Sequence, residues 1–371
     1  MMEANNPCKL MTDDIDKYSK LTESGSNPDD ITHHEIKNGS SVTYKNINFD
    51  EMSFHCILEK PENNFKHIEI KNCFFKHDVF INVEFESLSI EQCCFEGKFY
   101  INKQYNTPER LVKIENLSIK NSKFNSNFKL HSCEIQNFFL QDVDFERNAD
   151  FFRTEFHTPD EIVFNAVNFR ALALFGNTFF KGHLFFKYVT FEGYTHFREA
   201  EFRKGLNLDF SNIEKEISFF GIKGLDEKSS KEKTSRETYR TVKYHLQKVG
   251  NIIDANKYHV LELEKKREDV CDKACDTWFD FADCIVLLIH KVSSNYSTAW
   301  PLALFWILFV GFISSYVVTK DIFNPEFYKF SSVLTSLDDF CGIYWLFIVN
   351  KILLGYLYYQ FVTAVRKDTR K

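Results

Sequence analysis

Large apolar residues return every five positions through much of the N-terminal half of the chain. The clearest run occupies residues 75, 80, 85, 90, 95 and 100, which are Phe, Phe, Phe, Ile, Phe and Tyr. A step of five fits neither the 3.6-residue period of an amphipathic helix nor the two-residue alternation of a half-buried strand. The step therefore predicts a coil in which every fifth side chain points inward.

The step persists from about residue 41 to residue 222, with an inserted loop at 102–112. A small residue commonly stands two places before the large one, as in Val-Asp-Phe ending at Phe145 and Val-Asn-Phe ending at Phe169. Five residues would form one flat side, and four sides would close a square coil of about 20 residues that pairs with the next coil. At this length the segment predicts about nine coils, spaced by roughly 4.8 Å.

The pattern of a small residue, Asp or Asn, a large apolar residue and two free positions resembles the pentapeptide-repeat family. The resemblance implies a bacterial protein with a β-solenoid, a right-handed quadrilateral β-helix, over residues 41–222. The alternative is an antiparallel all-β domain, which would show a sustained two-residue alternation that this segment lacks. The predicted solenoid core contains Phe75, Phe80, Phe85, Phe95, Phe145, Phe151, Phe156, Phe164, Phe169, Phe179 and Phe202.

The regions outside the solenoid differ from it in composition. Residues 1–40 are polar and acidic and predict a disordered N-terminal tail without a secretory signal. Residues 223–277 are charged with helical spacing and predict a cytoplasmic α-helical hairpin. In this hairpin Tyr239, Val242, Leu246 and Val249 would form one apolar stripe, with the turn at Gly250 and Asn251.

The C-terminal part of the chain is apolar. Residues 278–297 predict an interfacial helix, because their apolar stretch, residues 278–291, is too short to cross a bilayer. Within residues 298–371, two longer segments predict transmembrane helices at about 299–318 and 340–365, because each can cover the ~30 Å of hydrocarbon at 1.5 Å per residue.

Charges and aromatic residues orient the two predicted spans. Trp300 and Tyr316 fall at the expected membrane interfaces, and Arg366 and Lys367 begin a basic tail. The loop between the spans is acidic, so the positive-inside rule predicts an inner (cytoplasmic) membrane location with both termini cytoplasmic.

Two polar residues, Asn350 and Lys351, lie near the middle of the second predicted span. A lysine at that depth costs on the order of 3 kcal/mol. One interpretation is a helix broken at this point, from which Lys351 reaches water, or packing between copies of the chain. Another is a role in conduction or gating. The lack of a Thr-Val-Gly-Tyr-Gly filter between the spans argues against a channel.

Sequence motifs for chemistry are missing. The chain contains no GxGxxG, phosphate loop, HExxH or GxSxG, and no His/Cys set has zinc spacing. We therefore expect no catalytic residues, no cofactor and no metal. The ten cysteines are interpreted as small apolar filler in a reducing compartment. Without a basic stripe, and with a formal net charge of only −6, we expect neither nucleic-acid binding nor DNA mimicry.

Together these features predict a non-enzymatic scaffold anchored in the inner membrane. Its cytoplasmic solenoid would bind an unknown cytoplasmic protein, membrane lipid would surround the anchor, and homo-oligomerisation stays open. The alternative prediction is a channel-like or transport-associated membrane protein with Lys351 in an oligomeric pore.

Overall fold

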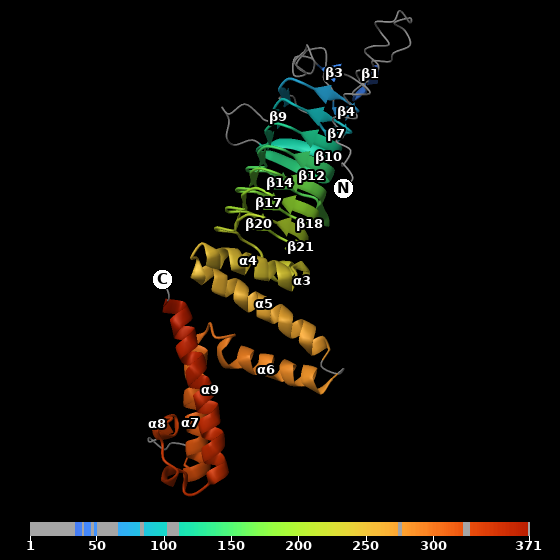
Figure 1. Cartoon of the computed structure of the whole chain (residues 1–371). Helices are drawn as coiled ribbons and strands as arrows, with labels where there is room; N and C mark the ends of the chain where they lie inside the picture. Colours follow the sequence, from blue (N-terminus) through green and yellow to red (C-terminus); the bar gives the residue numbers. More distant parts are fainter. Residues whose placement is uncertain are drawn as a thin grey trace, which may run out of the picture. The chain divides into compact units, whose positions relative to one another are not determined.

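The computed structural model describes residues 34–38, 41–45, 48–49, 66–81, 85–101, 111–273, 277–321 and 327–369. The chain forms two compact units, Met1–Thr238 and Tyr239–Lys371. The first contains a β-solenoid and the second is α-helical (Figure 1). Residues 1–33 of the predicted tail lie outside the described residues, whereas His34–Asn38 form strand β1 and are not a disordered segment.

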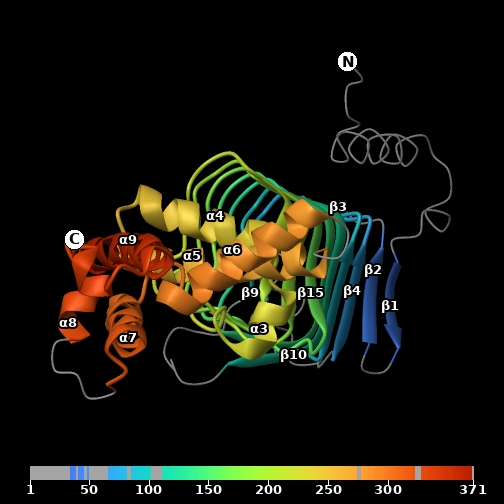
Figure 2. The same ribbon diagram turned by 90° about the horizontal axis from the view of Figure 1, so that it is seen from below.

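The solenoid has about 7 turns over residues 43–218, and its strands stack in parallel from one turn to the next (Figures 1 and 2). Strand β1 is the exception, because it pairs antiparallel with β2. We call the longest side of the coil the broad face. Its strands are β1 (His34–Asn38), β2 (Ser41–Lys45), β4 (His67–Lys71), β7 (Ser87–Glu91), β10 (Val112–Phe124), β12 (Cys133–Phe145), β15 (Glu161–Phe169), β18 (His183–Phe191) and β21 (Leu206–Ile213).

Shorter strands form the other sides of the coil. The strands that follow the broad face around the first corner are β3 (Asn48–Phe49), β5 (Phe74–Phe75) and β8 (Cys94–Phe95). The next side contains β6 (Val79–Ile81), β9 (Phe99–Ile101), β11 (Phe128–Leu130), β13 (Ala149–Asp150), β16 (Ala173–Leu174), β19 (Thr195–His196) and β22 (Ile217–Ser218). The last side contains β14 (Glu155–Phe156), β17 (Phe179–Phe180) and β20 (Glu201–Phe202).

Phenylalanine rings stack in columns inside the solenoid. One column runs through residues 75, 95, 124, 145, 169 and 191, with neighbouring ring centroids 4.6–5.3 Å apart. A second runs through residues 151, 175, 197 and 219 at 4.9–5.6 Å. Because parallel strands repeat every ~4.8 Å, a flat ring at the same place in each turn meets the ring of the next turn. Each fully buried Phe contributes about 1.5–3 kcal/mol, which explains why this residue dominates the segment.

Two of the eleven predicted core residues lie outside the core. Phe80 and Phe179 are only half buried and face outward. Val79 and Ile81 take the inward positions on either side of Phe80. Phe180 takes the inward position next to Phe179. A strand sends alternate side chains to opposite faces, so within these short strands the inward position is set by the alternation and falls one residue away from the step of five. The buried members of the predicted set are Phe75, Phe85, Phe95, Phe145, Phe151, Phe156, Phe164, Phe169 and Phe202.

The turns are longer than the predicted square coil. The register pairs Ile70 with Ile90, but it pairs Leu140 with Phe164 and Phe164 with Phe186, so later turns have 24 and 22 residues. Longer turns give about 7 of them where nine were expected.

The corners of the coil use left-handed backbone. At ten described positions, each two places after an inward residue, a non-glycine residue has φ between +46° and +57°. Left-handed geometry costs an L-residue roughly 1–2 kcal/mol. These corner residues are Asn72, Gln92, Asn121, Ser132, Asp142, Arg153, Ala166, Asn177, Tyr188 and Glu199.

Helices follow the last strand. They are α3 (Lys228–Lys233), α4 (Arg236–Lys248), α5 (Ile252–Asp272), α6 (Trp278–Ser294), α7 (Trp300–Thr319), α8 (Phe327–Phe330), the 3-10 turn η2 (Asp338–Phe340) and α9 (Tyr344–Thr369).

The two ends of the solenoid are closed differently. At the C-terminal end, hydroxyl groups stand where a further strand would lie: Thr234 Oγ1 and Thr238 Oγ1 accept hydrogen bonds from the backbone N–H groups of Leu206 (3.2 Å) and Leu208 (2.9 Å). These contacts satisfy amides of the edge strand β21. At the N-terminal end the sheet finishes with the antiparallel strand β1.

The predicted hairpin is present as α4 and α5. The turn between them contains Gly250 with φ +81°, and the Asn251 side chain accepts a hydrogen bond from the backbone N–H of Asp254 at 3.2 Å, which caps α5. Three members of the predicted stripe, residues 239, 242 and 246, are buried. Val249 is 63% exposed, because it lies beyond the last packed turn of α4.

Helices α7 and α9 are long and apolar enough to cross a membrane by length and composition, and we call them the candidate spans. Helix α9 begins at Tyr344 and not at residue 340, because Asp338–Phe340 form η2. It continues unbroken through Asn350 and Lys351, so the predicted interruption at this point is wrong.

The cysteines are not all filler. A disulfide joins Cys271 of α5 to Cys284 of α6, and Cys94 is also disulfide-bonded, which corrects the expectation of reduced cysteines at these three positions. Cys73, Cys93 and Cys133 are reduced and buried in the solenoid. Burial raises the pKa of the Cys93 and Cys133 thiols, so both are unreactive in the folded protein.

Candidate functional site

Aromatic side chains gather on the outside of the broad face in the later turns. Phe139, Phe210 and Tyr188 are 41%, 56% and 61% exposed. Val163 and Phe185 are half buried between them in the register of β15 and β18. The ring centroid of Phe210 lies 6.1 Å from that of Phe185 and 6.2 Å from that of Tyr188. We call these five residues the aromatic patch.

Lysines flank the aromatic patch. Lys120 Nζ lies 4.8 Å from the ring centroid of Phe139, and Lys187 Nζ lies 5.5 Å from that of Tyr188. Such cation–π contacts are worth about 0.5–1 kcal/mol at exposed sites and hold the amines beside the rings. The patch therefore offers aromatic area together with positive charge, which suits an apolar ligand segment that also carries carboxylates.

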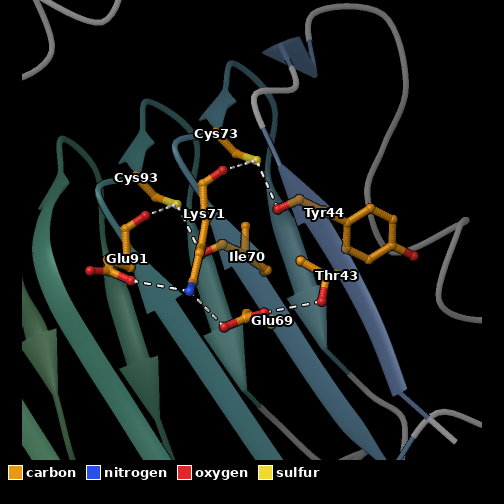
Figure 3. A network of polar contacts seen from close by, with 8 residues as sticks. All are labelled: Thr43, Tyr44, Glu69, Ile70, Lys71, Cys73, Glu91 and Cys93. Atoms are coloured by element: carbon orange, nitrogen blue, oxygen red, sulfur yellow. Dashed lines mark hydrogen bonds and ion pairs between the residues drawn. The ribbon is translucent and has the colours of Figure 1, made fainter. Parts of the chain in front are cut away.

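The first turns of the same face are polar (Figure 3). Lys71 Nζ lies 2.9 Å from Glu69 Oε1 and 3.6 Å from Glu91 Oε2, and Thr43 Oγ1 donates to Glu69 Oε2 at 3.1 Å. The hydrogen bond from Lys71, helped by that from Thr43, lowers the pKa of Glu69. These side chains satisfy one another across neighbouring turns.

Behind this polar surface the thiols of two buried cysteines point to backbone carbonyls. Cys73 Sγ donates to the oxygens of Lys71 (3.1 Å) and Tyr44 (3.6 Å), and Cys93 Sγ makes matching contacts one turn later (Figure 3). Cys73 and Cys93 occupy the small inward position two places before Phe75 and Phe95. Their thiols therefore stabilise the backbone of the coil. The N-terminal half of the broad face lacks exposed aromatic residues among its described side chains, so the aromatic patch is local.

The predicted polar pair in α9 contacts the segment between the candidate spans. Asn350 is 1% exposed, and its Nδ2 donates to Ser314 Oγ at 2.9 Å and to the Phe330 carbonyl at 3.2 Å. Lys351 Nζ donates to the Ser332 carbonyl at 3.1 Å. Asn350 thus binds α7 and the last residue of α8, and Lys351 binds the chain that follows α8.

Close packing fixes the same segment against both candidate spans. A Cβ at Gly311, near the middle of α7, would lie 2.8 Å from the backbone nitrogen of Ser331. The Tyr358 hydroxyl on α9 donates to the Ser331 carbonyl at 3.1 Å. Lys351 Nζ lies 5.3 Å from the ring centroid of Phe347. The arrangement holds the lysine amine by contacts within the chain.

A second buried polar cluster, not predicted from the sequence, joins α6 to α9. Gln360 is 4% exposed, and its Oε1 accepts hydrogen bonds from Ser294 Oγ at 3.1 Å and from Ser297 Oγ. His290 Nε2 lies 2.9 Å from Ser297 Oγ. The only sequence signal is one glutamine in an aromatic run.

The predicted interface residues lie near the helix ends. Trp300 begins α7 and is 38% exposed, with its ring centroid 6.3 Å from that of Phe361 on α9. Tyr316 lies in the last turn of α7 and is 45% exposed. Arg366 and Lys367 lie in the last turn of α9, where Lys367 Nζ donates to the Tyr296 carbonyl at 3.4 Å.

A buried ionic cluster ties α4 to α5. Glu262 accepts hydrogen bonds from Lys243 Nζ at 2.5 Å and Arg240 Nε at 3.2 Å. Burial acts to raise the pKa of Glu262, but these two cations outweigh it and lower the pKa below its usual value. Burial lowers the pKa of the neighbouring His259 to about 4, and the charges of Lys367 and Lys243 add to this effect. His259 is therefore neutral at pH 7.

Metal binding finds no support in the described part of the chain, where no three His, Cys, Asp or Glu side chains are arranged to hold an ion. Comparison of the chain with models of protein families, with curated proteins and with solved structures finds no match. Membership of the pentapeptide-repeat family therefore stays a prediction from the five-residue step, whereas the β-solenoid is a property of the structure.

Proposed function

We propose that this chain is a non-enzymatic scaffold, anchored in a membrane by α7 and α9, whose solenoid binds a protein partner through the aromatic patch. The observation that carries the proposal is the combination, in one chain, of a stiff β-solenoid and two apolar helices long enough to span a bilayer. A solenoid with a continuous core provides an extended surface for binding.

The burial pattern of the candidate spans supports an anchor. Phe305 on α7 and Ile352 on α9 are 56% and 67% exposed, while Asn350 and Gln360 are almost fully buried. Apolar side chains outside and polar side chains inside suit a lipid environment, because polar groups in hydrocarbon need partners within the protein.

Helix α6 extends the anchor as an interfacial helix. Trp278, Phe279 and Val286 are 74%, 80% and 61% exposed, whereas Lys291 Nζ on the same helix lies 3.0 Å from Glu264 Oε1 of α5. An exposed apolar side on a helix that leads directly into a candidate span fits the boundary between headgroups and acyl chains. We place the solenoid and both termini in the cytoplasm of a bacterium, on the inner membrane, from the basic residues Arg366 and Lys367 in the last turn of α9.

The expected partner is a protein segment with apolar and acidic side chains. Aromatic residues are enriched in the cores of protein interfaces, and the aromatic patch supplies them, while the flanking Lys120 and Lys187 add positive charge. The alternative of an oligomeric pore around Lys351 is not better supported, because the Lys351 amine already has a carbonyl partner.

Photo-crosslinking in cells, followed by extraction of membranes with alkaline carbonate, tests the proposal. A p-benzoyl-phenylalanine at position 210 should give one discrete adduct in the membrane pellet. The matched control places the same residue at Leu172, which is 37% exposed on another side of the coil. Reversing Lys120 and Lys187 to Glu should abolish the adduct. A fully soluble chain would contradict the anchor, and equal adducts from both positions would contradict the binding surface.

A further inference from the structure

The disulfide between Cys271 and Cys284 joins α5 and α6 near the end where the chain passes from one helix to the other. Cys271 is the second-last residue of α5, and Cys284 lies in the second turn of α6, which turns back along α5 (Figure 1). The two cysteines are 13 positions apart, so the bridge closes a short loop of chain. Both residues are half-buried, which leaves part of each in contact with solvent.

The second half of α6, residues 287–294, is held by several contacts besides the disulfide. Lys291 Nζ lies 3.0 Å from Glu264 Oε1 of α5. Ser294 is fully buried, and its Oγ donates to Gln360 Oε1 of α9 at 3.1 Å. This half is therefore fixed to both neighbouring helices by side chains that do not depend on the oxidation of cysteine.

The first half of α6, residues 278–286, is exposed and carries apolar side chains. None of its residues is buried, and Trp278, Phe279 and Val286 are 74%, 80% and 61% exposed. Among the described residues, the bridge at Cys284 is the only covalent or polar side-chain contact between this half and another helix. The disulfide therefore determines whether the first half of α6 stays beside α5.

The described cysteines of the solenoid are protected from reagents in solvent. Cys94 is disulfide-bonded and 0% exposed, and the three reduced cysteines of the solenoid core are also buried. Buried cysteines are inert, whereas partly exposed ones take part in thiol–disulfide exchange. Within the described part of the chain, Cys271 and Cys284 thus form the bridge that a dissolved thiol reaches.

We propose that the Cys271–Cys284 bridge is a redox switch whose reduction releases the first half of α6. This inference rests on the cytoplasmic location in the proposed function, because disulfides in the cytosol are usually transient and catalytic or redox-sensing. The reductant is a dithiol, either a protein of the thioredoxin class or a small molecule. Its thiolate attacks one sulfur of the bridge, and its second thiol resolves the mixed disulfide. The reductant leaves as a disulfide, and the protein gains two electrons and two protons as two thiols.

Release changes what the apolar side of α6 contacts. In the oxidised chain the bridge keeps the first half of the helix along α5. In the reduced chain this half moves away from α5, with the fixed residues 287–294 as its pivot, and Trp278 and Phe279 enter the bilayer surface. An apolar helix side is stable at the boundary between headgroups and acyl chains. Reduction therefore frees one end of the α4–α5 hairpin from the anchor.

Hydrogen exchange of the full chain in lipid nanodiscs measures the release. Reduction with dithiothreitol should speed exchange in residues 278–286 by about 10-fold or more, because local opening then costs less, and should leave residues 287–294 unchanged. Oxidised glutathione should reverse the change. Cys271→Ser and Cys284→Ser should each show the fast exchange without a reductant. The matched control is Cys341→Ser, at an exposed free cysteine, which should respond to dithiothreitol as wild type does.

The redox state of the bridge in cells is the second measurement. Differential alkylation and mass spectrometry of the peptides that carry Cys271 and Cys284 should find free thiols in growing cells and the bridge after treatment with diamide. A pair that keeps one redox state under both conditions would overturn the switch, as would exchange in residues 278–286 that reduction does not change. The exchange comparison also works in detergent, so a chain released by alkaline carbonate would contradict the anchor and leave the exchange result to decide the switch.

Discussion

The solenoid and the candidate spans sort their side chains in opposite ways. In the solenoid, Phe145 and its stacked neighbours are fully buried, and lysines and carboxylates lie outside. In the candidate spans, Asn350 and Gln360 of α9 are buried, whereas Phe305, Phe309 and Phe312 of α7 are exposed. One chain thus carries two inverted patterns, which is what the proposed membrane anchor requires of regions that meet different solvents.

The largest effect is expected from a substitution in the solenoid core. Phe145→Ala removes a ring stacked on Phe124 and Phe169 and should cost about 3–5 kcal/mol in the free energy of unfolding. Denaturant unfolding followed by circular dichroism measures this, because all four tryptophans lie outside the solenoid. Tyr188→Ala, at an exposed position, should change stability by no more than about 0.5 kcal/mol. Equal losses would mean that the rings do not form the core.

A charge introduced at an exposed phenylalanine should have different effects on α7 and on the solenoid. Phe309 lies on α7 and is 40% exposed. If its side of the helix meets lipid, Phe309→Asp should make the free energy of membrane insertion about 3 kcal/mol less favourable. Phe210→Asp, on the outside of the solenoid, should leave folding and insertion within about 0.5 kcal/mol of wild type. The fraction in the pellet after carbonate extraction measures insertion. Equal membrane insertion of the two variants would contradict the idea that the exposed sides of α7 and of the solenoid meet different solvents.

Low pH should destabilise the helical unit through protonation of His259. The pKa of His259 is about 4 in the folded protein and returns to about 6.5 on unfolding. The unfolded state therefore binds more protons between these values. Stability that is fully present above pH 6.5 is lost as the pH falls through 4, by up to about 3 kcal/mol. Tryptophan fluorescence during thermal unfolding from pH 7 to 4 should show a loss that His259→Gln reduces.

The buried amide provides a smaller effect. Asn350→Leu removes the hydrogen bonds to Ser314 and to the Phe330 carbonyl and should cost about 1–2 kcal/mol, since polar contacts between membrane helices are individually modest. Thermal unfolding in detergent measures this loss. Ile352→Leu, at a 67% exposed position, should be neutral. A stabilised Asn350→Leu would show that the polar interior serves something other than packing.

The smallest expected effect concerns the end of the solenoid. Thr238→Val removes the acceptor for the Leu208 amide and should cost about 1 kcal/mol. Thr190→Val, within the paired strand β18, is the control and should be close to neutral. A cost at Thr190 as large as at Thr238 would contradict a special role for the hydroxyl.

The sequence predicted the solenoid because one physical requirement, an inward side chain in each flat side, repeats many times. It missed the outward positions of Phe80 and Phe179, since the alternation of side chains within the short strands β6 and β17, and not a fixed step of five, decides which residue points inward. It identified Asn350 and Lys351 because polar residues are conspicuous in an apolar segment. Their partners, Ser314 and Ser332, could not be found, because pairing across the two spans depends on the path of the chain after α8.

The left-handed corners have a consequence for how the solenoid assembles. A single turn carries strained residues such as Ala166 and Tyr188, yet an isolated turn has no neighbour with which to pair its strands. One turn is therefore unstable alone, and the free-energy barrier is crossed only when several turns form together. Growth then proceeds by addition at the ends of an existing stack, and unfolding retreats from those ends, as in a one-dimensional cooperative system.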